Sequence, residues 1–431
     1  MSWKEDYKRK LTTAGEAVKA IKAGKRVVLG HCCGEPQHLV RAMMANKEAY
    51  ENVEIVHMVP MGPSEYCRPE NAKHFMHNSL FAGTTTREAI NTGRAKYTSC
   101  FFSEIPRLFK EKILPVDVTM CALSPPDEHG YCSFGVSVDY TKPAAESSKI
   151  VIAQINDQMP RTLGDAFIHV SQLDYIVGYN EPLPELQLAS ITKVEMEIGR
   201  YCAELIDDSA CLQLGIGGIP DAVLSFLGEK KDLGIHTEMF SDGVVDLINQ
   251  GVITCAKKNF RKRKLIATFF MGTRKLYDFV HNNPLVEMHP VDYTNDPFII
   301  AQNDNMVAIN SAIQVDFVGQ VASDTIGATQ FSGVGGQVDF VRGASRSKGG
   351  KAILAFPSTA GGGKHSRIVP RLDEGASVTD TRSDVHYIVT EYGIANLRGK
   401  SVRERAVSLI NIAHPNFREQ LARELSMMPV L

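Results

Sequence analysis

Two stretches of the chain share one pattern of apolar and small residues. Residues 26–44 (RVVLGHCCGEPQHLVRAMM) and 211–227 (CLQLGIGGIPDAVLSFL) each begin with a short apolar run, pass through glycines and end in a segment with helical spacing. A short apolar run is typical of a buried parallel strand, glycines permit a tight turn, and Pro36 or Pro220 suits a first helical turn. Each stretch therefore predicts a strand, a glycine turn and a helix.

An extended run follows each of these predicted helices. Residues 53–59 (VEIVHMV) and 235–240 (IHTEMF) predict strands, which completes a βαβ unit twice. The spacing from the turn glycine is also similar, with 27 residues from Gly30 to His57 and 23 from Gly215 to Glu238. The pattern predicts two related α/β halves, and only the second half has a glutamate toward the end of its second strand.

A proline-containing segment separates the two halves. Residues 181–187 (EPLPELQ) disfavour a central strand or a helix and predict a connector, so we place the domain boundary near residue 190. This gives an N-terminal domain at residues 1–190 and a C-terminal domain at residues 191–431. Residues 192–205 have the spacing of an amphipathic helix that opens the second domain.

The predicted fold class is α/β, with two related open α/β domains, mostly parallel or mixed sheets, and the active site between them. Further along, residues 264–270 (KLIATFF) predict a buried strand and residues 402–425 are helical in pattern. A length of 431 residues agrees with more than one domain.

Composition and net charge limit the kinds of molecule that the protein is expected to bind. A formal charge of −2, with 44% hydrophobic and 22% charged residues, is that of an ordinary globular protein without a general attraction for nucleic acid or an anionic membrane. The charged N-terminal residues MSWKEDYKRK and the lack of an apolar run of about 18 residues predict a cytoplasmic protein. Nine cysteines form no CxxC pair, and the adjacent Asp127, Glu128 and His129 have no companion ligand motif, so neither disulfides nor a metal site are expected.

The segment LGIGGIPDAV, residues 214–223, carries the sharpest local signal. Glycines between a strand and a helix leave backbone N–H groups open to a phosphate or to a developing oxyanion. The segment resembles the dinucleotide fingerprint GxGxxG, but Pro220 replaces the third glycine. From these residues alone, binding of an anion or acyl group and a purely structural turn remain equally open.

Glu238 has two functional interpretations and one structural one. In a dinucleotide fold, an acid about 20 residues after the glycine turn would bind the ribose. In an acyl-transfer enzyme, a carboxylate with an ordinary pKa of about 4.3 is ionised at neutral pH and can attack a thioester without a general base. The third interpretation is a solvated glutamate at a strand end. Ser241, Asp242 and Gly243 predict a turn and helix start after it, which places Glu238 near a sheet edge where ligands usually bind.

Two further segments remain ambiguous. The glycine cluster in FSGVGGQVDF, residues 331–340, is either a source of N–H donors for a thioester oxygen or a flexible loop. The basic run KKNFRKRK, residues 257–264, is either a solvated face or a contact for the phosphates of a nucleotide-containing cofactor.

Taken together, the motifs GIGGIPDAV, HTEMFSDG, GVGGQVDF, PSTAGGGKHSRIVP and TEYGIANLRGKS resemble the acetyl-CoA hydrolase/transferase family of class I coenzyme A (CoA) transferases. The likeness spans most of the chain and is strongest to members that act on 4-hydroxybutyrate or exchange CoA between butyrate and acetate. It implies that Glu238 is the catalytic nucleophile. The residues that it places at the CoA side of the site are Gly215, Ile216, Gly217, Gly218, Ile219 and Asn310, and the candidates for the oxyanion contact are Gly333, Gly335 and Gly336.

The resemblance also implies a ping-pong reaction through a glutamyl-CoA thioester. CoA is then a substrate, no tightly bound cofactor is expected, and the partners are acyl-CoA and short-chain carboxylates in a homo-oligomeric, most simply homodimeric, enzyme. From the internal duplication we expect the acyl pocket to draw on His31 and residues 58–64. The alternatives are an acyl-CoA hydrolase that uses the same glutamate, a non-catalytic CoA-binding protein and, more remotely, an NAD-dependent oxidoreductase.

Overall fold

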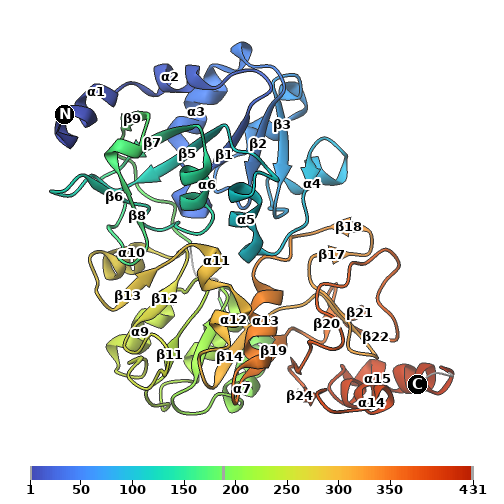
Figure 1. The fold of residues 1–431 in the computed structure, drawn as a ribbon. Coiled ribbons are helices and arrows are strands. Elements are labelled where there is room, and N and C mark those ends of the chain that lie inside the picture. The colour runs from blue at the N-terminus through green and yellow to red at the C-terminus, as the bar shows by residue number, and fades with distance from the viewer. Residues whose placement is uncertain (1, 187–189, 429–431) are drawn as a thin grey trace. The chain divides into compact units, whose positions relative to one another are not determined.

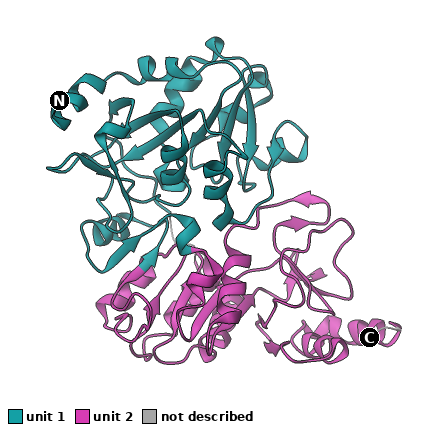
Figure 2. Cartoon of the chain, in the orientation of Figure 1, with its two compact units in different colours: residues 1–186, 266–294 teal, residues 187–265, 295–431 magenta. Residues whose placement is uncertain are grey.

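The computed structural model describes residues 2–186 and 190–428, and it divides into two compact units (Figure 2). Unit 1 consists of Met1–Leu186 and Ile266–Thr294, and unit 2 consists of Gln187–Leu265 and Asn295–Leu431. The first boundary between the units falls within the predicted connector, residues 181–187. Its described residues 181–186 form neither helix nor strand, and its last residue, Gln187, lies outside the described residues.

The segment Ile266–Thr294 differs from the sequence prediction, which gave it to the C-terminal domain. It belongs to unit 1 because its backbone is hydrogen-bonded there: the N–H groups of Val138 and Asp139 donate to the carbonyl of Thr268 at 3.1 and 3.2 Å. The N–H of Phe270 donates to the carbonyl of Val136 at 2.8 Å. A single boundary near residue 190 therefore does not separate the two units. Local sequence patterns do not indicate that a later segment of the chain belongs to unit 1.

Unit 1 is built on a seven-stranded sheet in which every neighbouring pair is parallel (Figure 1). In spatial order its strands are β4 (Lys96–Tyr97), β3 (Phe75–Ser79), β2 (Val53–His57), β1 (Arg26–Leu29), β5 (Val118–Leu123), β7 (Ile150–Ile155) and β9 (Tyr175–Gly178). β6 (Tyr131–Ser133) pairs with β8 (Phe167–His169), and β12 (Leu265–Ala267) pairs with β13 (Val286–Met288).

The helices of unit 1 are short. They are α1 (Trp3–Lys10), α2 (Ala14–Ala17), α3 (Gln37–Ala45), α4 (Arg87–Asn91), α5 (Ile105–Lys110), α6 (Thr141–Ser147), α10 (Arg274–Val280) and α11 (Val291–Thr294). One core cluster forms where Leu39 and Met43 of α3 pack with Val27 of β1 and Ile55 of β2, all fully buried. Burial of this apolar surface is the main stabilising contribution.

Unit 2 contains a six-stranded sheet that is parallel except for its last pair, in which β23 and β24 run antiparallel. In spatial order its strands are β11 (Gly234–Ile235), β10 (Cys211–Leu214), β14 (Met306–Asn310), β19 (Lys351–Ala355), β23 (Tyr387–Thr390) and β24 (Gly393–Asn396). The shorter strands are β15 (Gln314–Asp316), β16 (Val321–Ala322), β17 (Thr325–Ile326), β18 (Thr329–Gln330), β20 (Thr359–Ala360), β21 (His365–Ser366) and β22 (Ile368–Val369).

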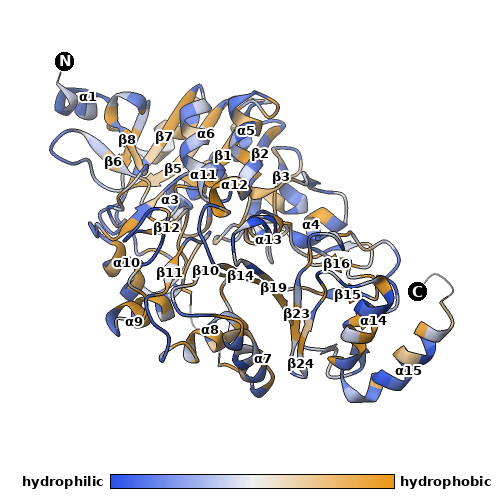
Figure 3. Ribbon diagram, turned by 60° about the horizontal axis from the view of Figure 1, so that its bottom comes forward, coloured by the Kyte–Doolittle hydropathy of each residue, from blue (hydrophilic) through white to orange (hydrophobic). Residues whose placement is uncertain are grey.

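The helices of unit 2 include the one predicted to open the second domain. They are α7 (Lys193–Glu204), α8 (Gly218–Ser225), α9 (Asp242–Asn249), α12 (Pro297–Ile300), α13 (Gln337–Arg346), α14 (Val402–Asn411) and α15 (Pro415–Ser426). α7 begins with a capping box in which Thr192 and Glu195 bond each other's backbone N–H. Both α14 and α15 carry orange apolar positions beside blue polar ones, while β23 is largely apolar (Figure 3). No helix among the described residues is long and apolar enough to cross a membrane.

The two sheets share one strand order, which confirms the predicted duplication. β2-β1-β5-β7-β9 in unit 1 corresponds to β11-β10-β14-β19-β23 in unit 2, and both runs are parallel. In unit 1, β1 lies between β2 and β5, and in unit 2, β10 lies between β11 and β14. The strand order therefore reverses at β1 and at β10. Such a reversal of strand order opens a crevice at the carboxyl ends of the strands, where open α/β sheets usually bind ligands.

The strand that leads to Glu238 is shorter than predicted. The sequence predicts an extended run at residues 235–240, whereas β11 ends at Ile235 and Glu238 lies in the following loop. The side chain of Thr237 explains the difference, because its hydroxyl lies 3.3 Å from the carbonyl of Leu214 and 2.7 Å from that of Met239. These local bonds replace sheet pairing and turn the chain.

Candidate active site

The candidate site of unit 2 is built from residues that follow neighbouring strands of the six-stranded sheet. β10 lies between β11 and β14, at the point where the strand order reverses. Gly215 follows β10, Asn310 ends β14, and Glu238 lies three residues beyond β11. The parallel arrangement places these residues at the same edge of the sheet, the edge at which a ligand site is expected.

A pocket of about 340 Å³ opens at this edge. It brings together the glycine turn and Asn310, which the sequence predicted for the CoA side of the site. Its lining residues are Glu195, Gly215, Ile216, Gly217, Gly218, Ile219, Pro220, Ile309, Asn310, Ser311, Ala355, Pro357 and Arg367. The residues of the predicted CoA side therefore share one cavity, although their contact with CoA stays a prediction.

Asn310 is oriented by a second amide side chain. Gln213 and Asn310 form a reciprocal pair in which each Nδ2 or Nε2 donates to the other's oxygen, at 3.0 and 3.3 Å. Gln213 is buried on β10, next to β14 in the sheet. Pairing leaves one N–H of each amide for a ligand, since every carboxamide has two.

The glycine turn has backbone geometry that suits its residues. Gly217 has a φ of 115°, a region that favours glycine, and it caps α8, whose first turn contains Pro220. Gly218 packs directly against the carboxylate of Glu195, so that an added Cβ would overlap it. This carboxylate at the N-terminus of α8 complements the helix dipole and lowers the attraction of the turn for a phosphate.

The positive charge in the pocket comes from Arg367, a residue of the PSTAGGGKHSRIVP motif. Its Nη1 donates to the carbonyl of Ala312 at 3.2 Å, and its Nε has no hydrogen-bond partner among the described residues. Burial lowers the pKa of Arg367 from its ordinary value, which nearby Glu391 opposes, and a guanidinium remains charged at neutral pH even so. Arg367 is thus the residue of the pocket best suited to an anionic or carbonyl group of a ligand.

Glu238 lies half-buried in the loop after β11, and a buried amide fixes its carboxylate. The Nδ2 of Asn295 donates to Oε2 of Glu238 at 2.8 Å. Asn295 itself is fully buried, and its Oδ1 has no hydrogen-bond partner among the described residues. A neutral donor holds the carboxylate in one orientation without adding a cation that would reduce its nucleophilicity.

A buried lysine also fixes the start of the loop that follows β11. Lys258, in the basic run at residues 257–264, is buried, and its Nζ donates to the carbonyls of Ile235 and Lys264 at 2.9 Å each. Lys258 therefore fixes the end of β11, while Lys257, Arg261, Lys262 and Arg263 of the same run are exposed. The run is partly structural and partly a solvated face.

The second glycine cluster reaches Glu238. Gly333, Gly335 and Gly336 are buried and immediately precede α13, and Gly336 is its N-cap. A Cβ placed on Gly336 would overlap both Oε2 of Glu238 and Nδ2 of Asn295. Among the three candidate glycines, Gly336 lies against the carboxylate of Glu238.

Comparison with known proteins decides the family. Residues 1–186 match the acetyl-CoA hydrolase/transferase N-terminal domain, and residues 272–425 match the C-terminal domain of the same family. The chain is 61% identical to the 4-hydroxybutyrate coenzyme A transferase of Clostridium kluyveri over 98% of this chain and 99% of that protein. The chain belongs to the acetyl-CoA hydrolase/transferase family.

Two further members of the acetyl-CoA hydrolase/transferase family agree with this assignment. The butyryl-CoA:acetate CoA-transferase of Anaerostipes caccae is 42% identical over 98% of this chain and 97% of its own length. The crystal structure of a 4-hydroxybutyrate CoA-transferase from Porphyromonas gingivalis has a TM-score of 0.86 and 44% identity, covering 99% of both chains. The resemblance found in the sequence motifs is confirmed, and the chain is an enzyme of the CoA-transferase class.

Sequence reasoning missed Asn295, Gln213 and Arg367 as residues of this acetyl-CoA hydrolase/transferase site. Gln213 carries a readable signal, since it is a polar residue within the otherwise apolar strand CLQL. Arg367 lies inside a quoted motif but was not singled out. Asn295 is 57 positions from Glu238 in the chain, and nothing in its neighbourhood indicates the contact.

Replacing Asn295 tests its role in the acetyl-CoA hydrolase/transferase site. We expect Asn295→Ala to lower kcat by about tenfold with a smaller change in KM, because the carboxylate loses its orientation while the pocket is retained. Steady-state kinetics with butyryl-CoA and acetate measure the effect, and Asn416→Ala at an exposed position of the same unit serves as the matched control. A kcat equal to that of wild type would show that the 2.8 Å contact does not orient Glu238.

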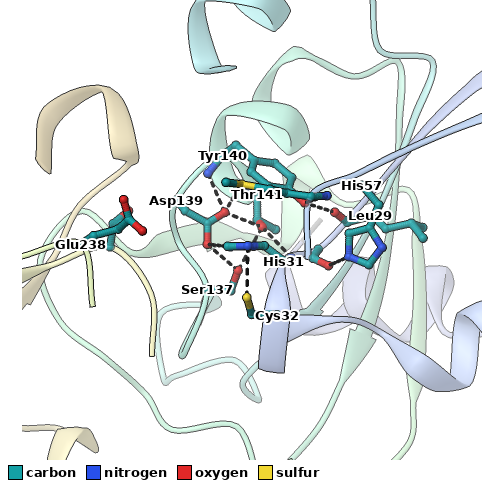
Figure 4. Close-up of polar contacts among 12 residues, drawn as sticks. Leu29, His31, Cys32, His57, Ser137, Asp139, Tyr140, Thr141 and Glu238 are labelled. Carbon is teal, nitrogen blue, oxygen red and sulfur yellow. Dashed lines mark hydrogen bonds and ion pairs between the residues drawn. The ribbon is translucent and has the colours of Figure 1, made fainter. Parts of the chain in front are cut away.

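His31, the residue predicted for the acyl pocket, lies in a buried network of unit 1 (Figure 4). Its Nδ1 is 3.2 Å from Oδ2 of Asp139, and its Nε2 is 3.1 Å from Sγ of Cys32. Asp139 also accepts from the hydroxyl of Ser137 at 2.7 Å and from the N–H of Tyr140 at 2.6 Å. These contacts satisfy both ring nitrogens, and a role of His31 in acyl binding stays a prediction.

Proposed function

We propose that the protein transfers CoA between an acyl-CoA and a short-chain carboxylate, with Glu238 as the covalent nucleophile. The acyl donors are acetyl-, butyryl- or 4-hydroxybutyryl-CoA, in keeping with the names of the relatives above. The observation that carries the proposal is the Glu238 carboxylate held by Asn295 and packed against Gly336 at the carboxyl edge of the sheet.

The proposed chemistry has two half-reactions. A Glu238 oxygen attacks the thioester carbonyl, forming an acyl-glutamyl anhydride and releasing the CoA thiolate. The thiolate then attacks the glutamyl carbonyl, which forms a glutamyl-CoA thioester and releases the first carboxylate. The acceptor carboxylate repeats these steps in reverse and restores Glu238. Backbone N–H groups of the turn at Gly333, Gly335 and Gly336 supply the oxyanion contact.

Binding of CoA far from the reacting bond makes these intermediates accessible. Contacts with the pantetheine and nucleotide parts can be used to offset the unfavourable anhydride. The pocket formed by the turn Gly215 to Ile219, Asn310 and Arg367 is the part of unit 2 assigned to this remote binding. CoA is bound as a substrate, and a tightly bound cofactor is not part of the proposal.

A cytoplasmic homodimer is also proposed. All nine cysteines are free thiols, which suits a reducing compartment. Size-exclusion chromatography with light scattering measures the oligomeric state directly, and two-fold oligomers are the most frequent arrangement of soluble enzymes.

The alternative, an acyl-CoA hydrolase, differs only in what resolves the covalent intermediate. Incubation with butyryl-CoA and acetate separates the two activities. A transferase forms acetyl-CoA with butyrate, and free CoA thiol does not accumulate. A hydrolase releases free thiol at a rate that does not depend on acetate. The first result is expected here, and the second would replace transfer by hydrolysis.

A further inference from the structure

Asp380 is a buried carboxyl group that the proposed chemistry does not use, and it contacts the residue next to the glycine turn. Nε2 of Gln337, the first residue of α13, is 2.5 Å from Oδ2 of Asp380 and 2.7 Å from the hydroxyl of Ser323. Asp380 is fully buried, and its Oδ1 has no hydrogen-bond partner among the described residues. Gln337 follows Gly336, which lies against Glu238.

Backbone hydrogen bonds also hold the residues on both sides of the glycine segment. The backbone of Asp380 pairs with that of Val321 in β16, with N···O distances of 3.1 and 3.2 Å. On the other side of the glycines, the N–H groups of Phe331 and Ser332 donate to the carbonyl of Asp324 at 2.8 and 3.0 Å. The segment between Ser332 and Gln337 is thus fixed at both ends, and the side chain of Gln337 contacts both Asp380 and Ser323.

The charges around Asp380 disfavour its ionised form. Asp324 precedes β17, Asp384 follows Asp380 in the chain, and Arg342 lies on α13. Burial raises the pKa of Asp380 to about 7; the bond from Gln337 and the charge of Arg342 oppose the rise, while Asp384 and Asp324 add to it. The neutral acid can still accept from Gln337 through Oδ2, with its proton on Oδ1.

We propose that Asp380 is a positioning residue that holds Gln337 through its Oδ2 and thereby keeps the glycine turn against Glu238. The inference rests on the proposed function, since it concerns the geometry of that site. The bond from Gln337 lowers the pKa of Asp380, so this bond is stronger to the ionised carboxylate than to the neutral acid, and ionisation strengthens the anchor. CoA transfer therefore rises as pH rises through the ionisation of Asp380.

The pH dependence of kcat tests the proposal. Butyryl-CoA and acetate are the substrates, and the proteins are wild type, Asp380→Asn and the control Asp373→Asn, which changes an exposed carboxyl group of the same unit. Wild type and the control are expected to gain kcat as pH rises, with a midpoint near pH 7, and Asp380→Asn to lack this step. A step near pH 7 that is the same in Asp380→Asn overturns the inference. Absence of transfer by wild type at every pH would instead contradict the proposed function.

A double-mutant cycle tests the link to Gln337. Gln337→Ala and Asp380→Ala are each expected to lower kcat by roughly 10- to 100-fold through displacement of the turn. The double variant is expected to resemble Gln337→Ala, because loss of Gln337 already removes the contact with Asp380. Effects that multiply overturn the inference, and Asp380→Asn, which keeps the acceptor oxygen, is the rescue variant if the alanine variants fold poorly.

The ionisation of Asp380 should also appear in the pH dependence of the free energy of unfolding. The carboxyl ionises near its ordinary value of 3.8 in the unfolded chain and near 7 in the folded one, so the folded state holds an extra proton between these values. Its stabilising contribution is present in full below pH 3.8, is lost as pH rises from there to about 7, and changes no further above that pH. Wild type is expected to lose stability relative to Asp380→Asn over this range in urea unfolding, and parallel curves overturn a neutral Asp380.

Discussion

Glu238→Ala is expected to lower kcat by roughly 10⁴-fold or more, because the variant lacks the nucleophile on which both half-reactions depend. The fold should be retained, since Glu238 lies half-buried in a loop and contributes little to a core. Glu238→Gln keeps the shape of the side chain without a carboxylate, and it should be as inactive as the alanine variant.

Steady-state kinetics with butyryl-CoA and acetate, together with circular dichroism, provide the measurement. Glu229→Ala, at an exposed position of the same unit, is the matched control and should retain its activity. Substantial transfer by folded Glu238→Ala would mean that another group carries the acyl and CoA intermediates.

Gly336→Ala should have the second largest effect, a loss of roughly 100-fold or more in kcat. An added Cβ would overlap Oε2 of Glu238 and Nδ2 of Asn295, so either the carboxylate leaves its position or the glycine turn moves away. The φ of Gly336 is −94°, which alanine also adopts, so the expected loss comes from the contact with Glu238 and not from backbone strain.

A matched glycine separates this effect from a general sensitivity to alanine. Gly228 is exposed, and an added Cβ there would meet no atom within 4 Å. Gly228→Ala is expected to behave as wild type in kcat and in thermal unfolding. Gly336→Ala with nearly wild-type kcat would show that the carboxylate does not need its present position.

Much of the fold could be predicted from local patterns. The apolar runs and glycine turns around Gly30 and Gly215 located β1, α3, β10 and α8, because buried parallel strands and helix starts leave clear local signals. The shared spacing also predicted two related α/β halves, and the structure shows that their sheets have a common strand order. The short β11 was not predicted, because the side-chain bonds of Thr237 that turn the chain compete with sheet pairing and leave no periodic pattern.

The candidate site was predictable only in part. Glu238 and the glycine clusters lie in recognisable motifs, whereas Asn295 and Asp380 take part through contacts across 57 and 43 positions of the chain. Such contacts depend on the three-dimensional fold, since a single sequence shows no periodicity between distant positions. For the same reason the return of Ile266–Thr294 to unit 1 could be seen only in the structure.

Covalent loading of Glu238 is the central claim, and mass spectrometry tests it most directly. Wild type and Glu238→Ala are incubated with butyryl-CoA and then with borohydride, which reduces a glutamyl thioester, and their peptides are compared. The account predicts a reduced product on the peptide that contains Glu238 in wild type, and no such product in the variant. Turnover of butyryl-CoA by wild type without modification of that peptide would contradict it.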